Sequence, residues 1–406
     1  MKYYIIWAID IFWFFIMYSS SSKTNYDIII IGAGSLGTPT ALFLANAGYR
    51  VLVLDSGASV GQGSNKKAIG GIRATHSDPA KVRLCQRSIE IFSTWKETYG
   101  DDIEWFQGGY CFVAYREREE KILKSLIEKQ RRDYQLNIDW YDHEDLLHLV
   151  PDLNPRNLIG GTFSPEDGSI SPLLSVHSFY SQAIKAGVHF KFHEPVTAIN
   201  IENGHVVGVT TPLDSYESNY VINAAGSWSR EVGALAGVNI EVHPDSHEAA
   251  ITEAVSHFLD PMIVDIRPAE GSSNFYFYQH LTGQIIFCIT PEPQAWGMDQ
   301  RETSNFLPMV TKRMLEVMPK LKNIRVRRTW RGLYPMTPDG YPIIGWAKEV
   351  EGFLQVTGMC GQGLMLGPGT AELVVRIIQG KTTPDDREIL AITSPYRDFT
   401  GQEMLK

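Results

Sequence analysis

The 406-residue sequence contains only four cysteines, and they lie far apart. Cys85, Cys111, Cys288 and Cys360 form no C-x-x-C pair. This spacing argues against a disulfide framework and against a zinc site built from paired cysteines, so no metal site is expected. Sparse, scattered cysteines are typical of proteins from a reducing compartment.

The sequence also has no excess of positive charge. It contains 37 lysines and arginines against 46 aspartates and glutamates, which gives a net charge of −9. Nucleic-acid-binding domains usually carry a basic surface, so we expect no nucleic-acid partner. The composition is that of a soluble globular enzyme, and the length exceeds one ordinary core, which predicts two domains.

The N-terminal segment MKYYIIWAIDIFWFFIM is apolar, but it is shorter than the roughly 20 residues of a membrane-spanning helix and is interrupted by Asp10. Residues 1–23 fit three interpretations: a signal peptide with Lys2 as its charged start, a membrane anchor in residues 1–18, or an extension before a true start at Met17. We favour the last and expect a cytoplasmic protein, because the cysteine pattern is that of an intracellular chain.

The strongest motif lies in residues 26–55, YDIIIIGAGSLGTPTALFLANAGYRVLVLD. An apolar strand predicted at 28–31 leads into Gly32, Gly34 and Gly37 with G-x-G-x-x-G spacing, followed by a helix and a second strand. In dinucleotide sites the first glycine makes the turn, the second lets the backbone approach a pyrophosphate, and the third lets the helix pack on the strand. The free amides of the helix start favour the phosphates.

Asp55 ends the second strand of this unit. A carboxylate at this point can accept hydrogen bonds from both hydroxyls of an adenosine ribose, and an acid rather than an arginine argues against a 2′-phosphorylated nicotinamide cofactor. An ordinary strand-helix-strand unit would leave Asp55 unexplained. The motif therefore predicts a dinucleotide site.

A second glycine-rich turn, GMCGQGLMLGPG, follows a strand predicted at residues 353–357 and precedes a helix predicted at residues 371–378. It would provide another helix start with free N–H groups. Two such sites, one near each end of the chain, suit a ligand that is anionic at both ends. A flavin dinucleotide is such a ligand, because its pyrophosphate is anionic and its ring becomes negative at N1/C2=O on reduction.

Between these two turns, the glycine-rich and polar loop at residues 56–71 is expected to wrap around a ligand, with Lys66, Lys67 and Arg73 supplying positive charge. Helices are predicted at residues 79–99, 116–134, 142–150 and 172–186. Residues 240–335 alternate strands and turns, and His247, Tyr276 and Tyr278 are expected in an antiparallel sheet that forms a wall of the substrate cavity.

Both glycine-rich blocks resemble FAD-dependent oxidoreductases of the D-amino-acid oxidase superfamily, and within it the sarcosine oxidase β-type, glycine oxidase and proline dehydrogenase β-type proteins. The resemblance covers residues 26–393. It implies an α/β plus α+β protein: a Rossmann-like FAD domain of the glutathione-reductase type and a mixed-sheet substrate domain. The FAD domain would comprise residues 24–100, 166–236 and 332–395, the substrate domain residues 101–165 and 237–331, and the tail residues 396–406.

By position, the resemblance implies a set of backbone and side-chain contacts to FAD. The implied cofactor residues are Gly32, Gly34, Ser35, Leu36, Gly37, Asp55, Ser64, Arg73, Val196, Ala225, Gly226, Gly361, Gln362, Gly363 and Leu364. The implied substrate and catalytic residues are Tyr334, His76, Tyr276 and Tyr278.

Four positions depart from the sarcosine oxidase pattern. Gly332 stands where a cysteine bonds FAD, and Pro172 where a histidine bonds FMN, so FAD is expected to be non-covalent. Met365 replaces a substrate-binding lysine, and His76 replaces an arginine that helps to hold the carboxylate. These changes favour a dehydrogenase-type protein over a sarcosine oxidase.

We therefore expect an FAD-dependent oxidoreductase that oxidises the C–N bond of a small amino acid or secondary amine, such as sarcosine, proline or glycine, by hydride transfer to flavin. The electron acceptor would be oxygen or a partner subunit. Two alternatives remain open at this stage: a flavin-containing accessory or assembly subunit without its own turnover, and an FAD-dependent dehydrogenase of 2-hydroxy acids or glycerol 3-phosphate.

Overall fold

The computed structural model describes residues 25–405. The apolar segment at residues 1–23, interpreted above as a signal peptide, an anchor or an extension, lies outside the described residues. Within residues 25–405, no helix combines the length and the apolar character that crossing a membrane requires.

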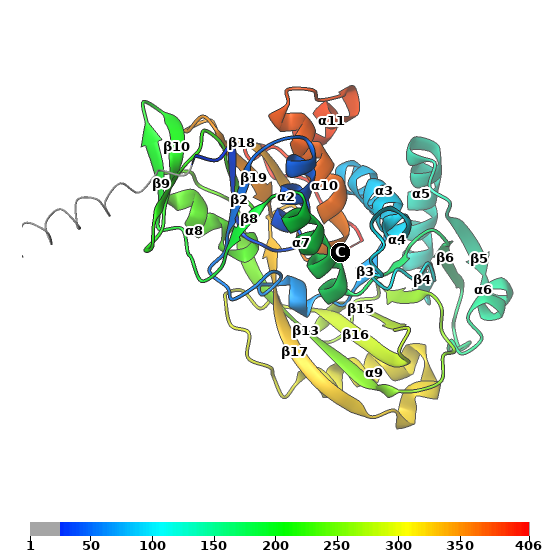
Figure 1. Ribbon diagram of the computed structural model, residues 1–406. Coiled ribbons are helices and arrows are strands. Elements are labelled where there is room, and N and C mark those ends of the chain that lie inside the picture. Colours follow the sequence, from blue (N-terminus) through cyan, green and yellow to red (C-terminus); the bar gives the residue numbers. More distant parts are fainter. Residues whose placement is uncertain (1–24, 406) are drawn as a thin grey trace, which may run out of the picture.

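A six-stranded sheet forms the centre of the part of the fold that contains the first glycine turn (Figure 1). Neighbouring strands are parallel except for the antiparallel edge pair β18–β19. In spatial order the strands are β18 (Ile343–Trp346), β19 (Phe353–Thr357), β12 (Val221–Asn223), β1 (Ile28–Ile31), β2 (Val51–Leu54) and β8 (His189–Lys191).

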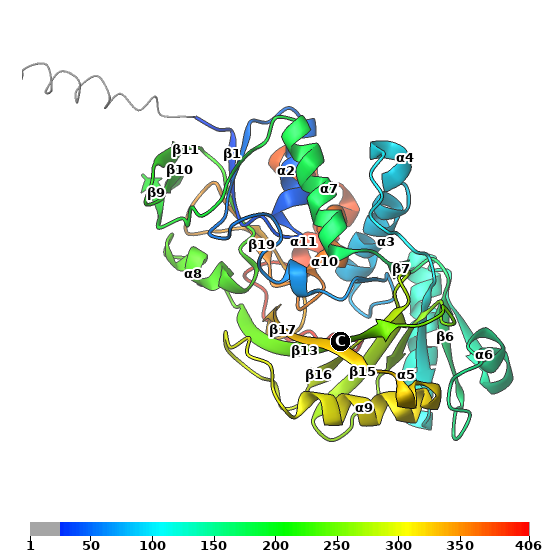
Figure 2. The same ribbon diagram turned by 60° about the horizontal axis from the view of Figure 1, so that its bottom comes forward.

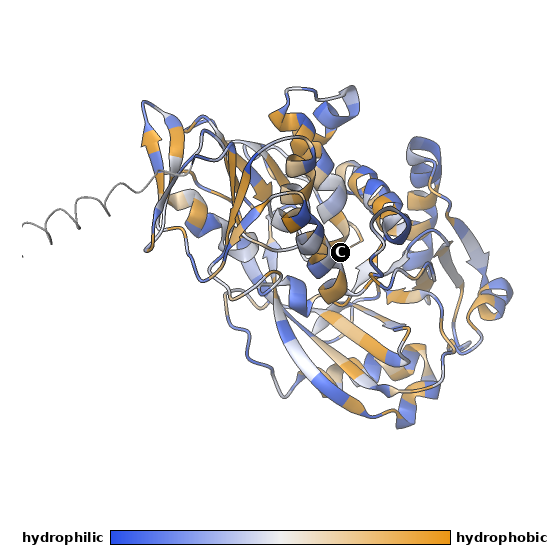
Figure 3. Ribbon diagram, in the orientation of Figure 1, coloured by the Kyte–Doolittle hydropathy of each residue, from blue (hydrophilic) through white to orange (hydrophobic). Residues whose placement is uncertain are grey.

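The sequence IIII of β1 is buried along its whole length, as the uninterrupted apolar run predicted. Ile28 and Ile30 pack into the core on one side of the sheet, and Ile29 and Ile31 pack into the core on the other side. Figure 3 shows this sheet as a mostly hydrophobic interior between more polar outer elements.

Helices cover one face of this sheet, and α10 packs against both α2 and α3 (Figure 1). The helices of this layer are α2 (Gly37–Asn46), α3 (Pro79–Ser93), α4 (Trp95–Tyr99), α7 (Pro172–Lys185), α10 (Gly363–Ile378) and α11 (Pro384–Ile392). The other face is covered by β9 (Ala198–Glu202), β10 (His205–Thr210), β11 (Ser215–Glu217) and α8 (Ser229–Ala234).

An eight-stranded mixed sheet forms the second large layer, and α9 lies on the side of it that faces away from the first sheet (Figure 2). In spatial order its strands are β17 (Val326–Met336), β13 (His243–Ala254), β16 (Gln284–Pro291), β15 (Ser272–Gln279), β14 (Met262–Asp265), β4 (Tyr110–Ala114), β6 (Gly160–Ser164) and β5 (Asp139–Asp142). The helices beside it are α5 (Glu117–Tyr134), α6 (His143–Leu149), α9 (Phe306–Val317) and the 3₁₀ helix η3 (Pro319–Asn323).

Short elements join the two layers. They are the two-stranded ribbon of β3 (Gly71–Ile72) and β7 (Gly168–Ser169) and the 3₁₀ helices η1 (Asn65–Lys67) and η2 (Gly226–Trp228).

The prediction of a mixed α/β architecture with a second, mixed sheet is confirmed. The glutathione-reductase-type assignment and the domain boundaries stay predictions.

Two predicted helices have different bounds in the structure. The helix expected at residues 79–99 is divided at Thr94 into α3 and α4. The helix expected at residues 371–378 begins earlier, at Gly363, and therefore contains Gly367 and Gly369. These glycines permit close packing, because a Cβ on Gly367 would overlap the Ser35 carbonyl oxygen and one on Gly369 would overlap that of Leu84.

Candidate functional site

A cavity of about 570 Å³ lies where the carboxyl ends of the parallel strands meet the eight-stranded sheet. Its volume is within the range of about 300–1,000 Å³ that is usual for small-molecule and cofactor sites. The six-stranded sheet contributes the ends of β1 and β2 and the turns that follow β12 and β19, and the eight-stranded sheet contributes side chains of β4, β14, β15, β16 and β17.

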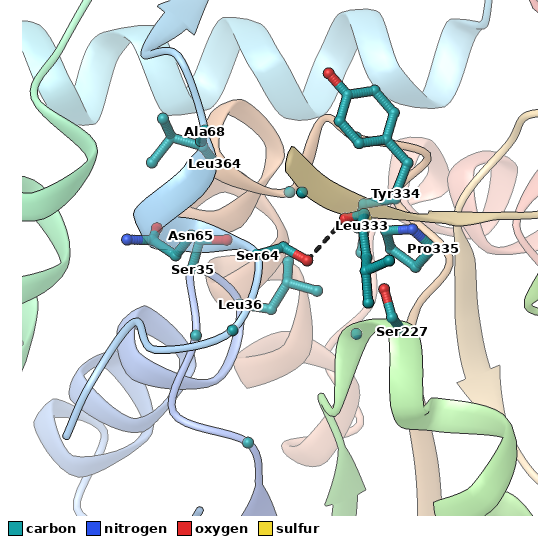
Figure 4. Close-up of a pocket in the computed structure, with 18 of the residues that line it drawn as sticks. Ser35, Leu36, Ser64, Asn65, Ala68, Ser227, Leu333, Tyr334, Pro335 and Leu364 are labelled. Carbon is teal, nitrogen blue, oxygen red and sulfur yellow. Dashed lines mark hydrogen bonds between the residues drawn. The ribbon is translucent and has the colours of Figure 1, made fainter. Parts of the chain in front are cut away.

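The structure brings nearly all of the predicted cofactor residues together around this cavity. Gly37 does not line it. The residues that do are Gly32, Gly34, Ser35, Leu36, Asp55, Ser64, Arg73, Val196, Ala225, Gly226, Gly361, Gln362, Gly363 and Leu364. Figure 4 shows how Ser35 and Leu36 from the first turn, Ser64, Ser227, Leu364 and the strand at Leu333–Pro335 surround one space.

The three glycines of the first turn have three different environments. Gly32 has φ +109°, and a Cβ there would lie 2.5 Å from the carbonyl oxygen of Ala224. A Cβ on Gly37 would overlap the Gly32 carbonyl oxygen, so Gly37 serves the packing of helix on strand. A Cβ on Gly34 would meet nothing within 4 Å, so this position faces open space where a ligand can approach the backbone.

The carboxylate of Asp55 holds the turn at the end of β2. Its Oδ2 accepts a hydrogen bond from the Ala33 amide at 2.7 Å, and its Oδ1 accepts one from the Gly57 amide at 2.6 Å. A carboxylate offers about four acceptor positions. Asp55 lines the cavity and therefore keeps acceptor capacity for the hydroxyls of a bound ribose.

The second glycine-rich turn faces the same cavity. The N-cap residue of α10, Gln362, makes no side-chain capping bond, so the first amides of this helix are not capped by it. Gly361 has φ +84°, and a Cβ there would overlap the ring of Tyr334. The turn therefore packs closely against Tyr334. Its amides are available to a ligand with partial negative charge.

Ser64 connects the loop after β2 to the eight-stranded sheet. Its Oγ donates a hydrogen bond of 2.7 Å to the Leu333 carbonyl oxygen, which Figure 4 shows as a dashed line. Leu333 precedes Tyr334 on β17. The bond therefore connects the loop after β2 to the strand that contains Tyr334.

A pair of tyrosines forms the polar part of the substrate-sheet wall. The hydroxyls of Tyr276 and Tyr334 lie 2.9 Å apart, and both residues line the cavity. Burial raises the pKa of both hydroxyls, so both stay protonated at neutral pH. The ring of His247 stacks on that of Tyr334 with centroids 3.7 Å apart, and Asp245 Oδ2 lies 3.0 Å from Nε2 of this histidine.

Arg73 places a buried guanidinium group in the wall of the cavity. It donates hydrogen bonds to the carbonyl oxygens of Thr75 and Leu405, the latter at 2.6 Å. No carboxylate among residues 25–405 lies within 4.0 Å of it. A buried cation without a direct counter-ion is costly, so this arrangement is suited to binding an anionic group of a ligand.

Two residues predicted to contact substrate do not line the cavity. His76 is buried, with its Nε2 3.5 Å from the Cys85 Sγ, and burial followed by the charge of Arg73 lowers its pKa well below the ordinary value. A neutral imidazole in this position does not attract a carboxylate. Tyr278 donates its hydroxyl proton to the Ile69 carbonyl oxygen and thus supports the loop behind the cavity.

The sequence interpretation missed the lining residues Tyr110 and Met262. Tyr110 lies on β4 and Met262 on β14, and no sequence pattern indicated that these two strands would border the cavity. Lys67, predicted as a positive charge in the loop around the ligand, lines the cavity. Its Nζ donates to the Arg331 carbonyl oxygen at 2.7 Å and to Gln300, and burial is the largest cause that lowers its pKa.

Comparisons with known proteins show which family the chain resembles. A family model described as FAD dependent oxidoreductase matches residues 27–377. The chain is 25% identical to glycine oxidase of Bacillus licheniformis over 365 residues, which are 88% of this chain and 94% of that protein. It is 25% identical to mitochondrial dimethylglycine dehydrogenase of Rattus norvegicus over 370 residues, 86% of this chain but 42% of that protein.

The structure of L-proline dehydrogenase from P. horikoshii is similar, with a TM-score of 0.85 and 29% sequence identity. The similarity covers 93% of this chain and 99% of that one. The structure of glycine oxidase from Geobacillus kaustophilus is similar over 92% of this chain and 99% of that one, with a TM-score of 0.82 and 23% identity. The family match extends across both glycine-rich turns and the strands that form the cavity.

Proposed function

The chain belongs to the family of FAD-dependent oxidoreductases, and we propose that it oxidises the C–N bond of a small amino acid or secondary amine of the sarcosine, proline or glycine type. Relatives named glycine oxidase, dimethylglycine dehydrogenase and L-proline dehydrogenase support an amine of this size. The enzyme uses FAD, and the two glycine-rich turns are proposed to hold it.

The observation that carries the substrate proposal is the pairing of Arg73 with the Tyr276–Tyr334 hydroxyls in one cavity. The guanidinium of Arg73 has no direct carboxylate partner among the described residues, whereas an amino acid supplies one. Met262 and Val264 of β14 add apolar side chains to the lining of the same cavity. A small molecule with one carboxylate and a short apolar body matches this arrangement.

When bound, FAD supplies the hydride acceptor of such an oxidation. Arg73, which the family resemblance assigns to the cofactor, is proposed instead to bind the substrate carboxylate and thereby to fix the orientation of the carbon that loses hydride. The protonated Tyr276–Tyr334 pair donates or accepts a hydrogen bond at the opposite polar group of the substrate. Neither hydroxyl acts as a base at neutral pH, because burial keeps both protonated, and an amine that binds without its extra proton needs no further base.

We further propose that FAD is held without a covalent bond, since Gly332 has no thiol at the position that the family resemblance assigns to the linking cysteine. The space at Gly332 is partly taken by Lys67, because a Cβ on Gly332 would lie 3.0 Å from the Lys67 Cβ. The glutathione-reductase-type FAD domain and its predicted boundaries belong to the same proposal.

Anaerobic reduction of the purified flavoprotein tests the proposed function. The panel comprises sarcosine, proline and glycine, with dimethylamine, pyrrolidine and methylamine as matched compounds that lack the carboxylate. We expect one of the amino acids to bleach the flavin. We expect the matched compound without the carboxylate to bind more weakly. Bleaching by 2-hydroxy acids or glycerol 3-phosphate alone would contradict the proposal, and bleaching by no compound would favour an accessory subunit.

A further inference from the structure

The last described residues enter the interior of the protein instead of ending on its surface. Glu403 and Leu405 are each 2% exposed, whereas Met404 between them is 50% exposed. Two inward side chains separated by one outward side chain are the pattern of a segment that packs on a surface made for it.

The carboxylate of Glu403 is held by Lys81 of α3 and by Ser77, two residues before this helix. Its Oε1 accepts hydrogen bonds from the amide of Ser77 at 3.1 Å and from its hydroxyl at 2.6 Å. Its Oε2 lies 3.5 Å from Nζ of Lys81, and both side chains are 1% exposed. The opposing charge of Lys81 contributes to holding the pKa of Glu403 below its ordinary value, so the pair is ionised and buried.

Leu405 connects this anchor to the cavity wall. Its carbonyl oxygen accepts the 2.6 Å hydrogen bond from Arg73, and its side chain packs in an apolar cluster with Tyr110, Met262 and Val264. These three residues also line the cavity. Leu405 therefore packs with three residues of the cavity wall.

The bond from Leu405 restricts how Arg73 can move. A guanidinium group is a planar fork with five N–H donors, and acceptors at both terminal nitrogens fix its orientation. Thr75 provides one of these acceptors from the same loop, and Leu405 provides the other from a segment more than 300 residues away. Without the second acceptor, the side chain could turn about its own axis.

We propose that residues 403–405, here called the C-terminal clamp, position Arg73 for binding of the substrate carboxylate. This inference rests on the proposed function, because it assigns the clamp to the site that holds the carboxylate. Glu403 and Leu405 are positioning residues: they act through Arg73 and do not touch the substrate.

The test measures substrate reduction and acetate binding in the full-length flavoprotein. In E403Q and in L405A, the apparent dissociation constants of the reducing amino acid and of acetate rise about 10- to 100-fold, while the limiting rate of flavin reduction changes less than about threefold. Met404→Ala is the matched control and leaves both constants unchanged, because its side chain points outward. Leu405→Met restores most of the affinity that L405A loses.

A double-mutant cycle separates positioning from general loosening of the fold. In an R73Q background, E403Q and L405A have no further effect on either dissociation constant, because the group they position is gone. Losses that add fully to that of R73Q would overturn the inference, as would unchanged constants in the single variants. If E403Q does not retain FAD, the same measurements on L405A alone support or overturn the inference. Failure of every amino acid to reduce the wild type would refute the proposed function, whereas the acetate measurements would still decide on the clamp.

Discussion

Substitution of Gly34 by alanine should weaken FAD binding without weakening the fold. A Cβ at this position meets no protein atom within 4 Å, and Gly34 is not among the glycines with positive φ. A Gly-to-Ala change at a compatible backbone position usually adds about 0.4–1 kcal/mol to the free energy of unfolding, because it restricts the unfolded chain. The apoprotein of G34A should therefore be at least as stable as the wild-type apoprotein.

The affinity of G34A for FAD, in contrast, is expected to fall. If the pyrophosphate of FAD lies against the amides of this turn, the new methyl group occupies the space through which the phosphate approaches. Loss of one charge-assisted hydrogen bond costs about 1.5–3 kcal/mol, which corresponds to a rise of roughly 10- to 150-fold in the dissociation constant of FAD.

Gly32→Ala is the matched control for this experiment. Its Cβ would lie 2.5 Å from a main-chain oxygen, and its φ of +109° disfavours any side chain, so this variant should lose about 2–4 kcal/mol of unfolding free energy even without FAD. Urea denaturation of both apoproteins and fluorescence titration with FAD measure the two quantities separately. Normal FAD affinity in G34A would refute the assignment of this turn to the pyrophosphate.

Three further predictions concern single side chains. Arg73→Gln should raise the apparent dissociation constant of amino-acid substrates by about 10- to 150-fold in anaerobic reduction but leave that of the carboxylate-free amines unchanged, and an equal loss for both classes would contradict its role. Tyr334→Phe should slow flavin reduction without shifting the alkaline limb of the pH–rate profile, because burial keeps this hydroxyl protonated beyond its ordinary pKa; a shifted limb would show that it titrates. Burial raises the pKa of Asp167 to about 7 from 3.8, so the unfolding free energy should fall by at most about 4 kcal/mol as pH rises from about 4 to 7. Urea denaturation of Asp167→Asn at a series of pH values should no longer show this decrease in the unfolding free energy. An unchanged pH dependence of the unfolding free energy would exclude Asp167 as its source.

The proposed nucleotide-binding part of the site could be predicted from the sequence because its requirements are local. The strand before Gly32, the turn, the helix and Asp55 follow one another without interruption, and each step has its own residue signature. The bounds of α10 were harder to predict, since Gly367 and Gly369 act as helix breakers in sequence terms. Only the position of the neighbouring helices, which approach at these two glycines, makes glycine favourable there.

The substrate side was less predictable because it depends on distances between strands. Tyr276 and Tyr278 are two residues apart and share one face of β15, yet only Tyr276 lines the cavity. The alternation of a strand indicates a face but not how far along that face the cavity extends. The role of the chain's last residues had no sequence signal at all, because a tail that contains glutamate and glutamine is normally exposed.

The arrangement of the parallel strands explains why two distant glycine-rich segments line one cavity. In the six-stranded sheet β12 lies between β1 and β19, and the carboxyl ends of parallel strands share one edge. The turns that follow these strands are therefore neighbours although more than 300 residues separate the first from the last. Helices α2 and α10 then start side by side, with Gly367 against the backbone of Ser35. Because no contiguous segment contains the whole site, it exists only when both ends of the described chain are folded together, and FAD binding must add directly to the stability of the complete fold.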